Sequence, residues 1–348
     1  MAPLSKSGKI DIVNIGLLVF SCALAFIVPF ELFLFVYAIL GPLHYLTEIS
    51  WLHDKNYYVN DKRDIILLVV LSLLITLLSL GAFQNAEFID LIFDPEGEGN
   101  GVGRRFFGSY LTYLGLASAL FMVFIKKPIL KFIGIAITFL LVVISNEFWV
   151  FFLVFLPTLV HVFLFTSLFM LFGALKSRSN LGLLAVILHI ACPFVLFSLF
   201  PGESFVGLTD YGKAAYQESA FQGLNYEVIT RFFDMQAFQG MSFEQVLYET
   251  NTGVAVMRFI AFAYTYHYLN WFSKTEIIRW HKVPKSRFAV VLVGWVVSIV
   301  LYAWDYTLGF KWLFLLSFMH VMLEFPLNYV SVIGIFKELK LRIVKPSS

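Results

Sequence analysis

Long apolar runs separated by short polar stretches recur along almost the whole chain. About 20 apolar residues cross the hydrocarbon core of a bilayer as a helix, and ten runs reach or approach that length. Pro29 separates the first two runs by a tight turn, because proline disfavours helix in the residue before it. We therefore expect an all-α fold, a single transmembrane bundle over residues 1–348. Its helices should number about ten, near 12–29, 31–50, 65–83, 107–125, 129–145, 148–173, 181–200, 253–272, 288–304 and 312–336.

Composition agrees with this interpretation. The chain is 59% hydrophobic and only 14% charged, whereas soluble globular proteins have about 25% charged residues. The surface of such a chain needs lipid, so we expect an integral membrane protein in contact with membrane lipid. No basic run typical of nucleic-acid binding is present. Cys22 and Cys192 lie inside apolar runs without metal-ligand spacing, so we interpret both as small buried hydrophobic residues.

Positive charge gives the bundle a direction. With the N-terminus in the cytoplasm, 19 of the 25 lysines and arginines fall in cytoplasmic segments, as the positive-inside rule predicts. We expect both termini on that side, most simply in the inner (plasma) membrane of a bacterium. The positive residues on the other side are Arg104, Arg105, Lys213, Arg231, Arg258 and Lys311.

The longest segment outside the predicted spans is 201–252, between the seventh and the eighth. It mixes aromatic and polar residues at near-helical spacing, which favours short amphipathic helices on the outer surface. Two roles are open: a structured loop with no chemical part, or a lid over a functional site.

Histidines inside the spans are the first candidates for chemistry. Ionisable side chains in lipid-embedded helices are costly, so they indicate a functional site unless they are paired or hydrated. Counted from the helix ends, four of the five intramembrane histidines lie within roughly 9 Å of one another along the membrane normal. These four are His44, His161, His267 and His320, and the fifth, His189, also lies near the midplane.

Two carboxylates accompany these histidines. Glu48 follows His44 by four residues and Glu324 follows His320 by four, so each pair shares one helix face. A carboxylate that accepts the second ring N–H of a metal-bound histidine is a common outer partner. Several imidazoles with carboxylates suit a mononuclear non-heme iron centre. Interhelical hydrogen bonding and a proton or ion pathway are the alternatives.

The segment GPLHYLTE at 41–48 resembles the motif that opens the Brp/Blh-type β-carotene dioxygenases, which are polytopic membrane enzymes. The resemblance implies that His44 is an iron ligand, that Glu48 stands at the motif's acidic position, and that a carotenoid is cleaved with O₂. Two positions depart from the family pattern. Tyr45 replaces a small residue, and Trp271 stands where a second histidine would follow His267.

Three functions follow from these features. The first is an iron-dependent dioxygenase-like enzyme whose aromatic residues line a cavity for a lipophilic substrate such as a carotenoid. The second is a non-catalytic subunit or scaffold of an envelope complex, with other membrane proteins as partners. The third is a lipid-group transferase that grips a phosphorylated headgroup with the basic segment 273–287.

Overall fold

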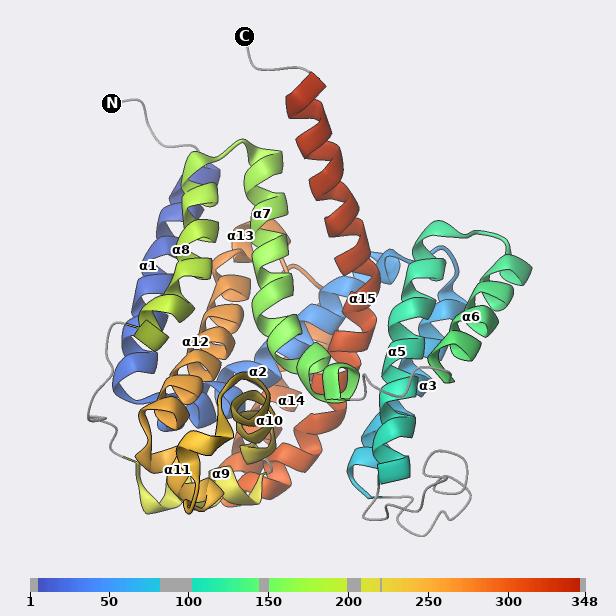
Figure 1. The fold of residues 1–348 in the computed structure, drawn as a ribbon. Coiled ribbons are helices and arrows are strands. Elements are labelled where there is room, and N and C mark those ends of the chain that lie inside the picture. Colours follow the sequence, from blue (N-terminus) through green and yellow to red (C-terminus); the bar gives the residue numbers. More distant parts are fainter. Residues whose placement is uncertain (1–5, 82–101, 144–149, 199–207, 220, 345–348) are drawn as a thin grey trace, which may run out of the picture. The chain divides into compact units, whose positions relative to one another are not determined.

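The computed structural model describes residues 6–81, 102–143, 150–198, 208–219 and 221–344. These residues form helices and contain no β-strand, so the all-α prediction is confirmed for this part of the chain (Figure 1). By Cα proximity the chain divides into two compact units. Unit 1 comprises residues 1–44, 162–310 and 334–348, and unit 2 comprises residues 45–161 and 311–333.

Seven helices of the described residues are long and apolar enough to cross a membrane: Gly8–Ile27, Pro29–Asp54, Arg105–Phe124, Phe151–Ser177, Asn180–Ser198, Lys285–Trp304 and Tyr306–Arg342. The other three predicted spans fall on α3, α6 and α12. Helix α3 begins with three charged residues, α6 is short, and α12 contains many polar side chains. An integral membrane protein with multiple passes accounts for these helices, and the count of ten stays a prediction.

Unit 1 is built around α12, whose side chains are buried along most of its length. Helices α1, α8 and α12 pack side by side, and α7 packs on α8 (Figure 1). The helices lying wholly in this unit are α1 (Lys6–Ile27), α7 (Thr166–Ser177), α8 (Asn180–Ser198), α9 (Asp210–Glu218), α10 (Gln222–Phe232), η4 (Met235–Phe238), α11 (Phe243–Glu249), α12 (Asn251–Ser273), α13 (Thr275–Ile278) and α14 (Lys285–Trp304).

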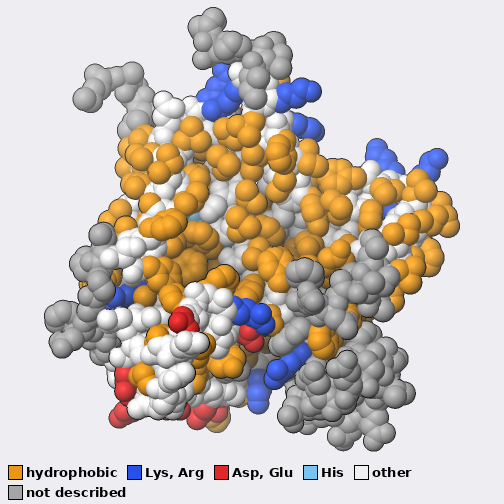
Figure 2. All heavy atoms as spheres, viewed as in Figure 1, with side chains coloured by type: hydrophobic (Ala, Val, Ile, Leu, Met, Phe, Trp, Pro, Cys, Tyr) orange, Lys and Arg blue, Asp and Glu red, His pale blue; other side chains and the backbone are white. Residues whose placement is uncertain are grey.

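One end of unit 1 gathers segments that the charge pattern assigns to the same side of the membrane. The Ser179 hydroxyl, in the α7–α8 turn, donates to Asp11 near the start of α1. Arg342, near the C-terminus, donates to the Leu175 carbonyl at 3.1 Å. Away from this end, the visible surface of α1, α7 and α8 is hydrophobic. Lysines and arginines gather near the ends of α7 and α15 (Figure 2). The assignment of this end to the cytoplasm stays a prediction.

The segment predicted as short amphipathic helices contains α9, α10, η4 and α11; residues 201–207 and 220 lie outside the described part. Its helices have strong N-terminal signals. Thr209 caps α9, and Ser242 with Gln245 forms a capping box on α11. Helices α10 and α11 pack on α12. Whether the segment acts as a lid stays a prediction.

Unit 2 is built on α5, which packs against α3 and α6. Polar contacts close the end of this group where α3 begins, α5 ends and α6 begins. The side chain of Asn60 donates to the carbonyls of Met122 (2.7 Å) and Val123 (3.0 Å) in the last turn of α5, and Lys131 pairs with Asp64. The helices wholly in this unit are η1 (Asn56–Tyr58), α3 (Lys62–Ser79), α5 (Val102–Phe124) and α6 (Pro128–Val143). Helix α2 (Pro29–Asp54), the π-helical segment η3 (Phe151–Phe165) and α15 (Tyr306–Val344) contribute residues to both units.

Candidate metal centre

Four of the predicted site residues form one possible metal-binding group. His44, His161, His267 and His320 each offer one ring nitrogen, and these atoms all lie within 4.8 Å of one another. Their exposed fractions are 1%, 1%, 8% and 2%, so the group is shielded from solvent. Imidazole nitrogens of this number suit borderline metals such as iron, copper or zinc.

Unit 1 contains two members of this group, His44 on α2 and His267 on α12. Their Nε2 atoms lie 3.0 Å apart, and the two rings meet edge to face. The other nitrogen of His267, Nδ1, lies 2.7 Å from the Thr166 hydroxyl. When Nδ1 carries the proton and donates to Thr166, Nε2 has the lone pair that a metal ligand needs. Thr166 was not predicted, since nothing in its spacing from the histidines marks it.

In unit 2 a similar pair is made by His161 on η3 and His320 on α15. Their Nε2 atoms are 3.1 Å apart. Nδ1 of His161 lies 3.0 Å from Oε2 of Glu324, and both side chains are almost fully buried. The two atoms do not have hydrogen-bond geometry, but the negative charge of a carboxylate so close favours a proton on Nδ1, which again leaves Nε2 as the ligand atom.

The sequence spacing suggests the histidine four residues before Glu324 as its partner, but Glu324 contacts a different one. Glu324 shares a helix face with His320, but it contacts His161 from a different helical segment. Both carboxylates are deeply buried: Glu48 is 3% exposed and Glu324 is 2% exposed. The i, i+4 spacing could not show which neighbouring ring the carboxylate meets.

Aromatic rings pack against the histidines at the two positions where the chain departs from the Brp/Blh pattern. The Tyr45 ring stacks on His320 with centroids 4.1 Å apart and is 2% exposed. The Trp271 ring lies edge-on to His44 at 5.4 Å. These two rings cover part of the imidazoles and help to keep water from them.

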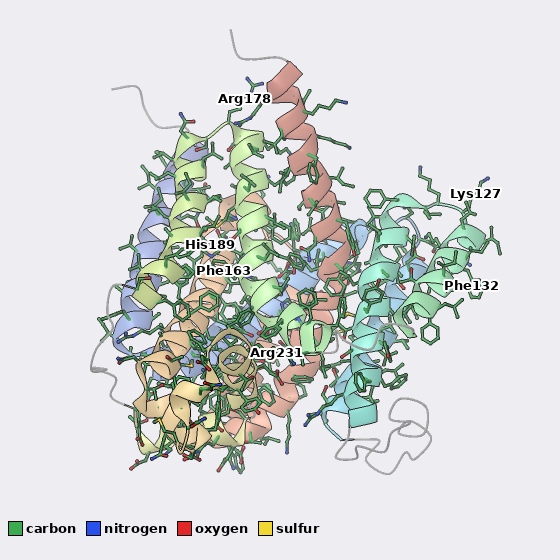
Figure 3. All side chains as sticks on the ribbon, viewed as in Figure 1. Lys127, Phe132, Phe163, Arg178, His189 and Arg231 are labelled. Carbon is green, nitrogen blue, oxygen red and sulfur yellow. The ribbon has the colours of Figure 1, made fainter. Side chains whose placement is uncertain are left out.

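His189, the fifth intramembrane histidine, does not belong to the group. It is fully buried in unit 1, where its Nδ1 lies 2.9 Å from the Ser167 hydroxyl. Its ring packs against Phe163 with centroids 4.5 Å apart (Figure 3) and against Tyr266 at 5.0 Å. This environment is that of a structural histidine that joins α7 and α8.

The Nε2–Nε2 distance within each pair can be compared with the distance between two ligands of one metal ion. At metal–nitrogen bonds of roughly 2.1 Å, two ligands at a right angle lie roughly 3.0 Å apart and two tetrahedral ligands roughly 3.4 Å apart. The observed distances of 3.0 and 3.1 Å are closer to the right-angle value. Both values lie within the range expected for two imidazole nitrogens bound to one transition-metal ion.

Comparison of the chain with protein-family models, curated proteins and solved structures gives no match.

Proposed function

We propose that this chain is a membrane-embedded, iron-dependent oxygenase-like enzyme that acts on a lipophilic substrate such as a carotenoid. The observation that supports it is the group of four buried histidines with ligand atoms within 4.8 Å of one another. The resemblance of residues 41–48 to the Brp/Blh motif supports the choice of iron and of a polyene substrate. The distribution of lysine and arginine supports a bacterial inner membrane location with both termini in the cytoplasm.

In this function the histidines hold the ion and the residues around them fix their protonation. Iron held by these imidazoles would supply the activation of O₂. Glu324 keeps a proton on Nδ1 of His161, and Thr166 does the same for His267. The rings of Tyr45 and Trp271 exclude water from the imidazoles. The seven helices of the described residues that are long and apolar enough to cross a membrane would place the chain in a bilayer, where such a substrate dissolves.

The alternative function is a non-catalytic membrane subunit or scaffold. The same Nε2–Nε2 distances of 3.0 and 3.1 Å favour it, because one neutral imidazole can donate a hydrogen bond to another at this distance. The pairs would then join α2 to α12 and η3 to α15, as polar side chains do between transmembrane helices. Metal content separates the two functions.

The test is elemental analysis of the full chain, extracted in mild detergent and reconstituted with Fe(II). The proposal expects about one transition-metal ion per chain, and iron-dependent O₂ consumption with β-carotene as the probe. Metal should be lost when His44, His161, His267 or His320 is changed to Gln and kept in His189→Gln, a matched control of the same residue type. A wild-type content below about 0.2 ions per chain, or full metal content in all four variants, would overturn it.

A further inference from the structure

A second candidate site lies in unit 1, on a different face of α2 from the histidine. A pocket of about 280 Å³ lies among the first half of α2, the second half of α14, the start of α15 and the start of α9. This volume is just below the range of small-molecule pockets, roughly 300–1,000 Å³. Phe35, which lines the pocket, precedes His44 by nine residues. At 100° per residue the two side chains leave α2 in opposite directions, so the pocket is not part of the metal centre.

The walls of the pocket are apolar and border a lipid-facing surface. Leu34 and Ala38 from α2 face Ile299 and Ala303 from α14. Phe35 is 58% exposed. Several valines of α14 near the pocket are also exposed, as expected for a helix that contacts lipid. An apolar chain from the bilayer therefore has direct access to these walls.

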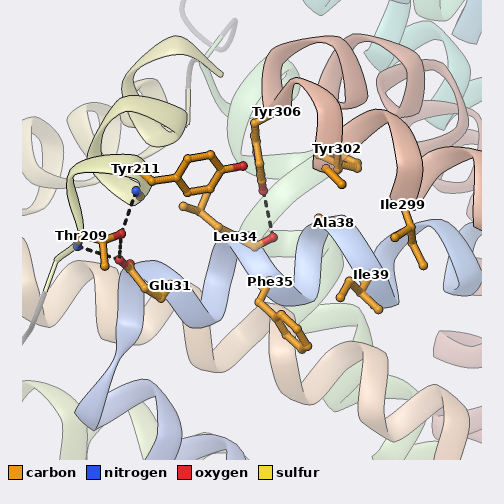
Figure 4. A pocket seen from close by; sticks show the side chains of 12 residues that line it. Glu31, Leu34, Phe35, Ala38, Ile39, Thr209, Tyr211, Ile299, Tyr302 and Tyr306 are labelled. Carbon is orange, nitrogen blue, oxygen red and sulfur yellow. Dashed lines mark hydrogen bonds between the residues drawn. The ribbon is translucent and has the colours of Figure 1, made fainter.

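The polar end of the pocket is a carboxylate with one oxygen in use. Oε1 of Glu31 accepts hydrogen bonds from the amide and the hydroxyl of Thr209, at 2.8 and 2.7 Å (Figure 4). Oε2 is buried, and it receives no hydrogen bond from the described residues. Gly212 lies directly against this carboxylate, since a Cβ there would be 2.6 Å from Oε1 and 2.9 Å from Oε2.

Charge defines what this end would bind. No ion pair found among the described residues includes Glu31. A buried carboxylate oxygen without a donor costs about 1–3 kcal/mol, or more when it is charged. A ligand that brings both a positive charge and hydrogen-bond donors removes this cost. A protonated amine has both properties, whereas a phosphate or a carboxylate would be repelled.

We propose that this pocket binds a membrane lipid with an ammonium headgroup, of the phosphatidylethanolamine type. The ammonium group donates to the Glu31 carboxylate, and one acyl chain lies along Ala38 and Ile299. Glu31 stands at the start of α2, where the chain turns back from α1, which places the headgroup near the end of the membrane-spanning segment. Because Thr209 caps α9 and also binds Glu31, the lipid joins the extramembrane helices to α2 and α14.

The test measures which lipids stay with the full chain after transfer from nanodiscs that contain equal amounts of phosphatidylethanolamine and phosphatidylglycerol. We expect phosphatidylethanolamine to be enriched about fivefold. Glu31→Gln should abolish this preference, and Ala303→Phe, which fills the pocket from its exposed side, should remove both lipids. Glu227→Gln is the matched control: it makes the same change at a carboxylate on α10 that pairs with Arg231 and does not line the pocket, so the preference should persist.

Competition with single-chain probes tests the ammonium group itself. Dodecylamine should displace the bound lipid, while dodecanol and dodecanoate should not. The proposal is overturned when phosphatidylglycerol is retained equally, or when Ala303→Phe keeps the full preference. Equal competition by dodecanol would also overturn it, because a hydroxyl donor would then suffice. These readouts do not involve iron, so they succeed or fail independently of the proposed function.

Discussion

Replacing Glu324 by Gln tests the metal centre at its most informative contact. The carboxylate lies 3.0 Å from Nδ1 of His161 and is 2% exposed. Glutamine keeps the size of the side chain but removes its charge, so the packing of α15 is preserved. A buried, charge-assisted contact is lost, and with it the preference for the His161 tautomer that presents a bare Nε2.

The magnitude follows from the kind of partner that each histidine has. Loss of an outer carboxylate partner typically weakens metal binding 10- to 100-fold, about 1.4–2.8 kcal/mol. The matched change is Thr166→Val, which removes the hydroxyl 2.7 Å from Nδ1 of His267. A neutral hydrogen bond contributes about 0.5–1.5 kcal/mol, so this variant should lose only about two- to tenfold. Glu324→Gln should therefore be the weaker binder of the two.

The assay is competition between the Fe(II)-loaded protein and a soluble chelator, with bound iron measured at each chelator concentration. Thermal unfolding in the same detergent checks that each variant is folded. His189→Gln should bind iron like the wild type, because His189 lies outside the group. Wild-type affinity in Glu324→Gln would refute the reasoning, as would a larger loss in Thr166→Val than in Glu324→Gln.

Three further predictions concern unit 1. Gly253→Ala should lower the stability by about 1–3 kcal/mol, because a Cβ there would meet main-chain carbonyl oxygens of α11 at 2.2 and 2.4 Å; Gly223→Ala in α10, which meets nothing within 4 Å, is the control in thermal unfolding. Arg258→Met should cost about 1–2 kcal/mol in the same assay, because Arg258 donates at 3.0 Å to a carbonyl in the last turn of α1; an unchanged unfolding temperature would contradict this. Cys22 on α1 and Cys192 on α8 carry free thiols, and these two helices pack together, so diamide should remove both from alkylation without forming dimers, and persistent double alkylation would exclude a contact between the two thiols.

Apolar run length was enough to find the helices, because lipid forces the backbone to satisfy its own hydrogen bonds. Each of the ten predicted spans falls on a helix. The length of an apolar run was less informative about which helices cross the membrane. A helix that is buried among neighbouring helices can carry polar side chains. Helix α12 shows this: it carries Arg258, Asn270 and His267 yet is among the most buried helices.

The position of each histidine along its helix could be predicted from the sequence. The direction in which its side chain points, relative to the neighbouring helices, could not. Counting residues from the helix ends brought His44, His161, His267 and His320 to one level, and they form one group in the structure. His189 lies at a similar predicted depth but outside the group, because α8 turns that side chain toward Ser167 instead. Sequence spacing fixes the rotation of a side chain relative to its own helix only. The orientation of that helix relative to its neighbours depends on packing, which no single-chain periodicity contains.

Charge balance is the physical argument that most favours an ion over simple hydrogen bonding. Four neutral imidazoles bring no charge, whereas Glu48 and Glu324 bring two deeply buried carboxyl groups. Histidines that only hydrogen-bond to one another would need no such carboxylates, and burying two like charges is costly. A divalent cation held by the imidazoles neutralises both. The structure thus combines neutral ligands with carboxyl groups that can balance the charge of a divalent metal ion, and the double variant Glu48→Gln, Glu324→Gln should lose bound metal even though all four histidines are kept.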